Sequence, residues 1–264
     1  MASDVPFEAV VVSGLRLDSR KRICYLIKMS SDLTKALAPY DNQKKTGPVP
    51  LPTKPCLWAI VGKKGCWKTT VVLNVLQRKE SPLYRHFDLI FWVSPTAGAD
   101  KKLEPLLEDI GEGQVYDDLN NAVIEDILAK CEAYTERHNK KKKRGDPQYC
   151  VVFDDCIHQI RSKRASLITR LATQNRHLKV SCFFLLQKWK SFPTIIRSNL
   201  DCITLFHNEN EQEIKSFCSE LGNEEKIRKM YEYATAEPYS FLHINGYAQP
   251  TRYYRRFDEI EFRK

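Results

Sequence analysis

The sequence predicts an α/β fold in which helices cover both faces of a mainly parallel sheet. The first observation behind this prediction is that continuous apolar runs alternate along the chain with stretches of helical spacing. The second is a glycine-containing turn followed by Lys-Thr, residues 62–69, which lies between an apolar run typical of a strand and one typical of a helix. A chain of 264 residues is long enough to form one large α/β domain, or one domain with an appendage.

The composition narrows the class of protein. A formal net charge of +9 favours a polyanionic partner such as nucleic acid. No apolar stretch is long enough to span a bilayer, and the first residues lack the basic start and apolar core of a secretory signal. The nine cysteines are scattered and include no C-x-x-C pair, which favours a reducing compartment.

Residues 1–49 are predicted to form a small N-terminal extension. Two short apolar runs, 7–12 and 23–29, are separated by Ser13-Gly14 and a charged stretch, which fits either a strand hairpin or a strand–helix pair. Residues 42–55 are rich in lysine, proline and glycine, as linkers are. The main domain is therefore expected to comprise residues 50–264.

A strand over residues 56–61 and a helix over 70–76 flank the glycine-containing turn. In this arrangement backbone N–H groups converge on phosphate oxygens, and the helix N-terminus and a lysine add positive charge. The pattern G-x-x-x-x-G-K-[ST] is met except that Trp67 stands in place of the second glycine. The predicted phosphate-binding residues are Gly62, Lys63, Lys64, Gly65, Cys66, Trp67, Lys68, Thr69 and Thr70.

Two further strands and a long helix follow. Aromatic and β-branched residues predict a strand within 86–96, which Pro95 ends, and a buried strand over 149–153. Between them, apolar residues at helical spacing predict a helix over 119–138. The loop predicted over 139–148 carries five consecutive basic residues. We favour a solvated surface loop over a DNA contact or a nuclear-import signal.

The C-terminal part is predicted to continue the alternation. A helix is expected over 157–173, strands over 180–186 and 203–206, and an acidic helical stretch over 209–234 that breaks near Gly222. A last strand over 241–244 precedes an aromatic, basic tail.

Acidic and amide side chains follow two of these strands. Asp154 and Asp155 close the strand over 149–153, and Gln187 follows the strand over 180–186. One carboxylate there can hold Mg²⁺ and a second can orient or deprotonate an attacking water, which is the arrangement of a Walker B motif. Ligands of parallel sheets lie at the carboxyl ends of the strands, so Gln187 is predicted to reach the same crevice and sense the γ-phosphate.

Two arginines are candidates for a charge supplied to a neighbouring subunit. Arg176 precedes the strand over 180–186, and Arg197 lies in the segment after Gln187. An arginine placed on the γ-phosphate stabilises the charge of the transition state. The alternative for either residue is a pair with a carboxylate or with DNA.

This combination resembles the viral genome-packaging ATPases of the FtsK/HerA superfamily, of the poxvirus and Polinton type. The resemblance runs from about Pro50 to the C-terminus, loosely so over 239–257, and leaves residues 1–49 uncovered. Its most specific stretch is Q-x-x-x-x-x-P-x-x-I-R-x-N from Gln187 to Asn199. The other matching stretches are P-L-P-T-K-P at 50–55, residues 87–96 ending in S-P-T, F-D-D at 153–155 and N-R-H-L-K-V-S at 175–181.

The resemblance implies a P-loop NTPase fold and a motor that uses ATP and Mg²⁺ to drive double-stranded DNA into a preformed capsid. The resemblance further implies that such motors act as rings, expected to be hexamers, with the nucleotide between subunits. The resemblance assigns Lys68 and Thr69 to phosphate and magnesium, Asp154 to magnesium, Asp155 to the base and Gln187 to the sensor. It also implies a sheet in which the Gln187 strand lies between the P-loop strand and the Walker B strand, a capsid or portal partner, and a place in the host nucleus, at the viral assembly site or in the virion.

Trp67 leaves three outcomes open, because the family's loop reads G-x-x-G-S-G-K-T and glycine lets the backbone approach the phosphates. The indole can point away and leave an altered ATPase, it can block the site, or it can stack on a base or a partner's side chain. The alternative function is therefore an inactive DNA-binding or scaffold protein of the same fold. That protein would bind DNA through basic residues after the Walker B strand, namely Arg161, Lys163, Arg164 and Arg170.

Overall fold

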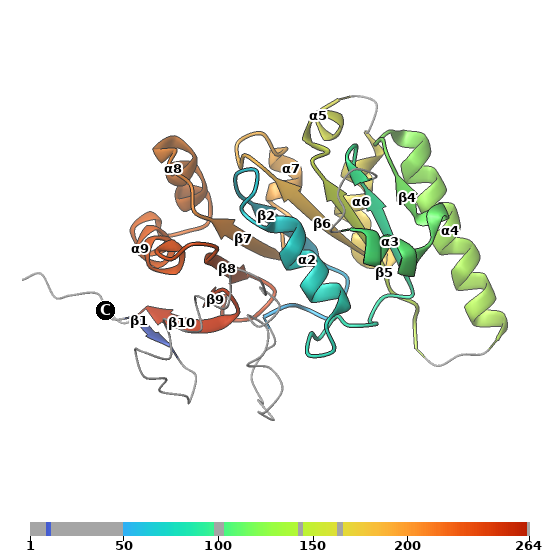
Figure 1. Ribbon diagram of the computed structural model, residues 1–264, viewed down its shortest axis with the longest axis horizontal. Helices are drawn as coiled ribbons and strands as arrows, with labels where there is room; N and C mark the ends of the chain where they lie inside the picture. Colours follow the sequence, from blue (N-terminus) through green and yellow to red (C-terminus); the bar gives the residue numbers. More distant parts are fainter. Residues whose placement is uncertain (1–8, 12–49, 98–102, 142–144, 163–165, 263–264) are drawn as a thin grey trace, which may run out of the picture.

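The computed structural model describes residues 9–11, 50–97, 103–141, 145–162 and 166–262. They build one ten-stranded sheet in the order β1-β10-β9-β8-β7-β2-β6-β5-β3-β4 (Figure 1). The parallel strands are β2 (Leu57–Val61), β3 (Leu89–Val93), β4 (Val115–Tyr116), β5 (Tyr149–Asp154), β6 (Val180–Leu186) and β7 (Cys202–Phe206). The antiparallel strands are β8 (Phe241–Asn245), β9 (Arg252–Arg255), β10 (Asp258–Phe262) and β1 (Ala9–Val11).

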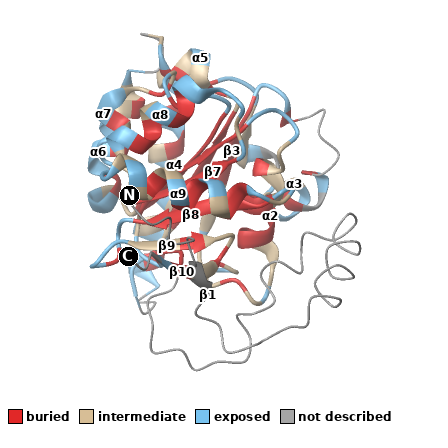
Figure 2. Ribbon diagram, turned by 90° about the vertical axis from the view of Figure 1, so that its left-hand side faces the viewer, coloured by how far each residue is buried: buried red, intermediate tan, exposed pale blue. Residues whose placement is uncertain are grey.

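Helices cover both faces of the sheet, which confirms the predicted fold class. One face carries α2 (Lys68–Gln77) and α3 (Glu104–Ile110), followed by the 3-10 turn η3 (Glu112–Gln114). The other face carries α4 (Asn121–Lys140), α5 (Ile157–Ile160), α6 (Leu167–Leu178), α7 (Thr194–Arg197), α8 (Glu211–Glu220) and α9 (Glu224–Thr235). Figure 2 shows the buried strands between these exposed helical surfaces.

The central strands are apolar on both faces because both faces are buried. In β2, Leu57, Ala59 and Val61 belong to one hydrophobic core, and Trp58 and Ile60 belong to the core on the opposite face. Every residue of β2 is buried. A buried parallel strand is therefore a continuous apolar run in the sequence, and this run is the pattern that predicted the strand.

The predicted place of the Gln187 strand, between the P-loop strand and the Walker B strand, is confirmed. Strand β6, which ends just before Gln187, pairs with β2 on one side and with β5 on the other. The acidic helical stretch breaks as predicted, and Asn210 and Asn223 cap α8 and α9 by accepting hydrogen bonds from backbone N–H groups.

Three predictions of local structure are wrong. The single helix predicted over 157–173 is instead α5 and α6, and α5 ends where Ser162 Oγ donates to the Gln159 carbonyl. The tail after β8 was predicted to add no strand, yet β9 and β10 form a hairpin whose turn includes Arg256 at φ 58°. The basic loop begins later than predicted, because α4 continues to Lys140.

The N-terminal extension is described only in part. Its residues Ala9–Val11 form β1, which pairs with β10 at the edge of the sheet. The strand hairpin or strand–helix pair predicted for the rest lies outside the described residues, as do Lys142, Lys143 and Arg144 of the basic run. Within the described part of the chain, no helix has both the length and the apolarity needed to cross a bilayer.

Candidate nucleotide site

The phosphate loop connects the carboxyl end of β2 to the first turn of α2. The Gly62 N–H donates to the Leu186 carbonyl at 2.9 Å, which fixes the start of the loop to β6. Gly65 and Trp67 have φ values of 79° and 77°, so the chain curls before Val71 N–H donates to the Trp67 carbonyl in the first helical hydrogen bond. A curled loop at a helix N-terminus directs backbone N–H groups toward an anion.

Gly62 leaves no space for a side chain. A Cβ built at this position would lie 2.4 Å from Cys66 Sγ and 2.8 Å from Phe206 Cβ, closer than real Cβ atoms approach such neighbours. The loop therefore packs directly against the end of β7, and glycine at position 62 is needed for that approach.

We expect Gly62→Ala to weaken ATP binding by at least about tenfold, because the loop must move away from β7 to admit the methyl group. Gly113→Ala is the matched control, since a Cβ at Gly113 meets nothing within 4 Å. Binding of a fluorescent ATP analogue by both variants measures the difference. Equal affinities of the two variants would show that the packing at Gly62 does not shape the site.

Lys68 places its ammonium group inside the loop. Its side chain is buried, and Nζ donates to the Gly62 carbonyl at 2.8 Å and to the Lys63 carbonyl at 3.0 Å. Burial raises the pKa of the neighbouring Cys66 thiol, an effect that the Lys68 charge opposes. Cys66 therefore stays neutral and adds no negative charge to the loop, whose lysine remains available to phosphate oxygens.

Thr69 and Asp154 meet across the loop. The Thr69 hydroxyl donates to Asp154 Oδ2 at 3.1 Å, and Asp154 ends β5. A hydroxyl and a carboxylate oxygen are hard ligands that suit Mg²⁺, which takes few protein ligands and completes its shell with water and phosphate oxygens. Among the described residues no group of three or more His, Cys, Asp or Glu side chains could hold a metal ion alone.

Asp155 and Gln187 form the second polar pair at this edge of the sheet. Gln187 Nε2 donates to Asp155 Oδ1 at 2.9 Å. Asp155 has a φ of 54°, a left-handed conformation that costs a non-glycine residue about 1 kcal/mol. Such strain is typical of functional positions, and here it turns the chain sharply after β5. The structure thus brings together the loop, Lys68, the Thr69–Asp154 pair and the Asp155–Gln187 pair.

The Trp67 ring lies against Tyr239. The two ring centroids are 5.0 Å apart with an interplanar angle of 65°. Tyr239 comes from the turn between α9 and β8, and it is not among the site residues predicted from the sequence. Only the antiparallel pairing of Phe241 with Phe206 at the end of β7 brings this turn to the phosphate loop, and no local pattern signals that pairing.

Neither candidate arginine reaches these groups within its own chain. Arg176 forms an ion pair with Asp201 at 2.7 Å, and Asp201 also accepts a hydrogen bond from the Leu57 N–H at the beginning of β2. Arg176 therefore lies at the amino edge of the sheet, opposite the phosphate loop. Arg197 donates to the Phe192 carbonyl and forms an ion pair with Glu220 at 3.0 Å.

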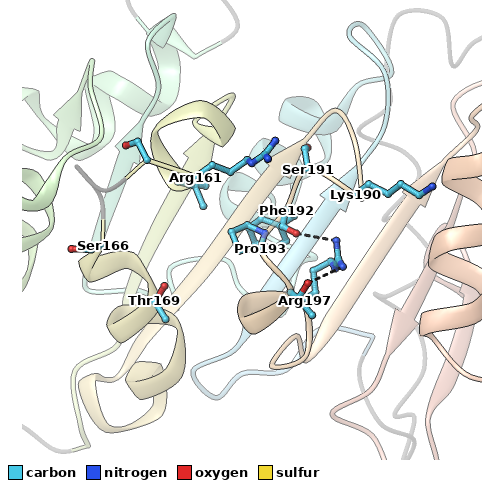
Figure 3. A pocket seen from close by; sticks show the side chains of 11 residues that line it. Arg161, Ser166, Thr169, Lys190, Ser191, Phe192, Pro193 and Arg197 are labelled. Atoms are coloured by element: carbon cyan, nitrogen blue, oxygen red, sulfur yellow. Dashed lines mark hydrogen bonds between the residues drawn. The ribbon is translucent and has the colours of Figure 1, made fainter.

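A separate cavity of about 530 Å³ lies between α5, α6 and the segment leading to α7. Figure 3 shows Arg161 and Lys190 on either side of Ser191. Both cations are exposed. Hydroxyl side chains supply much of the remaining lining, namely Ser162, Ser166, Thr169, Ser191 and Thr194. The cavity thus offers positive charge and hydroxyl groups, which suit phosphate oxygens.

Comparisons with known proteins agree with this geometry. Residues 49–232 match the family described as Poxvirus A32 protein. An uncharacterised protein, 075L of Invertebrate iridescent virus 6, is 23% identical over 194 residues, which cover 72% of this chain and 70% of that protein.

Solved structures share the fold. The genome packaging NTPase B204 from Sulfolobus turreted icosahedral virus 2, in complex with AMPPCP, matches with a TM-score of 0.53 and 16% identity over 77% of this chain and 98% of B204. The pCW3 conjugation coupling protein TcpA, with ATPγS, matches with a TM-score of 0.53 and 16% identity over 78% of this chain and 60% of TcpA. At these identities the two structures show that this chain has their P-loop ATPase fold.

Proposed function

The chain belongs to the poxvirus A32 protein family, and from this premise we propose that it is an ATP-hydrolysing motor that moves double-stranded viral DNA into a preformed capsid. The observation that supports the proposal most strongly is the convergence of two hydrogen-bonded pairs on the phosphate loop. Thr69 with Asp154 and Asp155 with Gln187 come from separate segments, yet they meet at the carboxyl edge of β2, β5 and β6.

Each residue has a role in this proposal. Lys68 leaves the loop carbonyls and binds the β- and γ-phosphates, while backbone N–H groups of the loop surround them. Thr69 and Asp154 hold Mg²⁺, which when bound neutralises charge on the phosphate oxygens. Asp155 accepts a proton from the attacking water. Gln187, hydrogen-bonded to Asp155, aligns that water and responds to the γ-phosphate.

An arginine from a neighbouring subunit completes the site in a ring, which we propose to be a hexamer. Arg176 and Arg197 both remain candidates. The Arg176 side chain is 65% exposed and the Arg197 side chain only 12%. Arg176 can therefore leave its carboxylate at a lower cost, because exposed ion pairs contribute little stability.

Double-stranded DNA is the proposed polyanion. The net charge of +9 and the cavity beside Arg161 and Lys190 support it. Both residues lie close in sequence to the proposed catalytic groups, since α5 follows Asp155 and Lys190 follows Gln187. DNA phosphates bound in this cavity would therefore contact the two chain segments that begin at the proposed hydrolysis site. A capsid or portal component is the proposed protein partner, and the host nucleus, the viral assembly site or the virion is the proposed location.

ATP turnover with and without double-stranded DNA tests the motor. We expect DNA to stimulate turnover of the native chain. We expect Trp67→Gly to raise turnover further at saturating ATP, because glycine relieves about 1 kcal/mol of strain at φ 77° and frees space beside the phosphates. Lys68→Ala is the inactive reference, with turnover lowered at least about a hundredfold.

The alternative function is a DNA-binding or scaffold protein that binds no nucleotide, and the substitution of Trp67 for glycine is the observation that favours it. It predicts DNA binding by the native chain without ATP binding. If the native chain, Trp67→Gly and Lys68→Ala all fail to bind ATP in the presence of Mg²⁺, the motor is excluded and the scaffold remains.

A further inference from the structure

Trp67 and Tyr239 form an aromatic pair at the mouth of the phosphate loop. Trp67 is the residue immediately before α2, and Tyr239 belongs to the turn before β8. Their rings meet edge to face, with centroids 5.0 Å apart. Tyr239 is 46% exposed, and Trp67 is partly exposed. The pair therefore presents aromatic surface to solvent directly beside the group that would bind phosphates.

The backbone is strained at both members of this pair. Trp67 and Tyr239 both have left-handed backbone conformations, with φ values of 77° and 60°, and each costs about 1 kcal/mol or more for a residue with a side chain. Glycine at position 67 would remove one of these costs. Tyr239 meanwhile leaves nearly half of its surface in water, so the turn before β8 presents an aromatic ring to solvent.

The fold positions the pair next to a bound nucleotide. Antiparallel pairing of β8 with β7 places Phe241 opposite Phe206, and Phe206 lies against Gly62 at the start of the phosphate loop. Tyr239 therefore stands at the same edge of the sheet as Lys68 and the Thr69–Asp154 pair. If the phosphates of a nucleotide lie on the loop, its base lies beyond the α-phosphate. The Trp67–Tyr239 pair lies beside the loop, where it can meet such a base.

We propose that Trp67 and Tyr239 bind the base of a nucleoside triphosphate. This inference rests on the proposed nucleotide site. Stacking on an aromatic side chain contributes about 1–3 kcal/mol per base and tolerates different bases, because every base has a π-face. The chain is therefore expected to bind ATP and GTP with affinities that differ by only about threefold, and to bind both more tightly than a triphosphate without a base.

The test compares ATP with inorganic tripolyphosphate in the presence of Mg²⁺. For the native chain we expect ATP to bind at least about tenfold more tightly. Tyr239→Ala should lose about tenfold in ATP affinity and nothing in tripolyphosphate affinity, whereas Tyr239→Phe should retain both. Tyr247→Ala is the matched control, because Tyr247 is also exposed but contacts Arg176 at the opposite edge of the sheet.

Tryptophan fluorescence gives a second readout. Trp58, Trp92 and Trp189 are at most 1% exposed, so a ligand-dependent change reports on Trp67. We expect ATP to quench this fluorescence and tripolyphosphate to leave it unchanged, and Trp67→Phe should lose the ATP signal.

Three results would overturn the assignment. Equal losses for both ligands in Tyr239→Ala would show that the pair supports the loop and does not contact a base. Equal native affinities for ATP and tripolyphosphate would exclude base binding, and the proposed ATPase function would survive if the chain still hydrolysed ATP. Binding of neither ligand would remove both proposals.

Discussion

Asp155→Asn is expected to lower ATP turnover by at least about a hundredfold while leaving ATP affinity within about twofold of the native value. A positioned general base contributes about 10²–10⁴ to a rate, and asparagine cannot accept the proton. The substitution preserves the local structure for two reasons. Asparagine tolerates the φ of 54° that Asp155 adopts, and its side-chain oxygen can still accept the hydrogen bond from Gln187 Nε2. Single-turnover kinetics and equilibrium ATP binding separate the chemical step from affinity.

The matched control is Asp126→Asn on α4, where the carboxylate is exposed and contacts Lys130 and Tyr116. This change should leave both turnover and affinity unaltered. If Asp155→Asn hydrolyses ATP at the native rate, another group must accept the proton of the attacking water. A matching loss in Asp126→Asn would attribute the effect to general destabilisation.

Acid is expected to destabilise the fold through His243, a fully buried residue of β8. Its Nε2 lies 2.8 Å from the Pro50 carbonyl, so this nitrogen must carry the proton and donate it. Nδ1 lies 2.9 Å from Thr204 Oγ1, which itself accepts a hydrogen bond from Trp58 Nε1. The neutral tautomer satisfies every member of this network. An added proton on Nδ1 would leave the Thr204 hydroxyl without its acceptor.

Burial lowers the pKa of His243 from 6.5 to about 4, an effect only partly opposed by the hydrogen bond to the Pro50 carbonyl. Above pH 6.5 the side chain is neutral in both states, so it imposes no penalty. As the pH falls below 6.5, His243 binds a proton in the unfolded chain but stays neutral in the native state. The free energy of unfolding therefore decreases until the pH reaches about 4. The loss over this window is about 3 kcal/mol, from about 1.4 kcal/mol per pKa unit.

Urea unfolding at pH 7.5 and pH 4.5 measures this effect, with His243→Gln as the comparison. Glutamine can donate to the Pro50 carbonyl and does not titrate. Other groups also titrate between these pH values, so the informative quantity is the difference between the two proteins in their pH dependence. The native chain should lose about 2–3 kcal/mol more than His243→Gln on acidification. Parallel losses in the two proteins would remove His243 as the cause.

The sequence was sufficient to predict that three polar side chains meet at one edge of the sheet, because parallel strands present their carboxyl ends together. Asp154, Asp155 and Gln187 each follow an apolar run, and each lies at the expected edge. The order of the central strands agrees with the one implied by the family resemblance. Placing the three polar residues needed only their position at strand ends, a local feature of the chain.

The features that were missed depend on contacts between distant segments. Tyr239 meets Trp67 because β8 runs antiparallel to β7, and nothing in the local sequence indicates that reversal. Arg176 was predicted as a candidate for the γ-phosphate of a neighbouring subunit. Its ion-pair partner Asp201, 25 positions later in the chain, lies at the edge of the sheet opposite the phosphate loop. The hairpin of β9 and β10 was missed because its buried residues, Tyr254 and Ile260, are flanked by partly exposed ones and form no long apolar run.

The central claim is that the loop around Trp67 holds a triphosphate. A structure determined with a non-hydrolysable ATP analogue and Mg²⁺ tests it most directly. The account predicts phosphate oxygens on the backbone N–H groups of the loop, Lys68 Nζ moved from the Gly62 and Lys63 carbonyls onto the phosphates, and Mg²⁺ between Thr69 and Asp154. An indole lying within the loop, with no anion bound at saturating analogue, would contradict it.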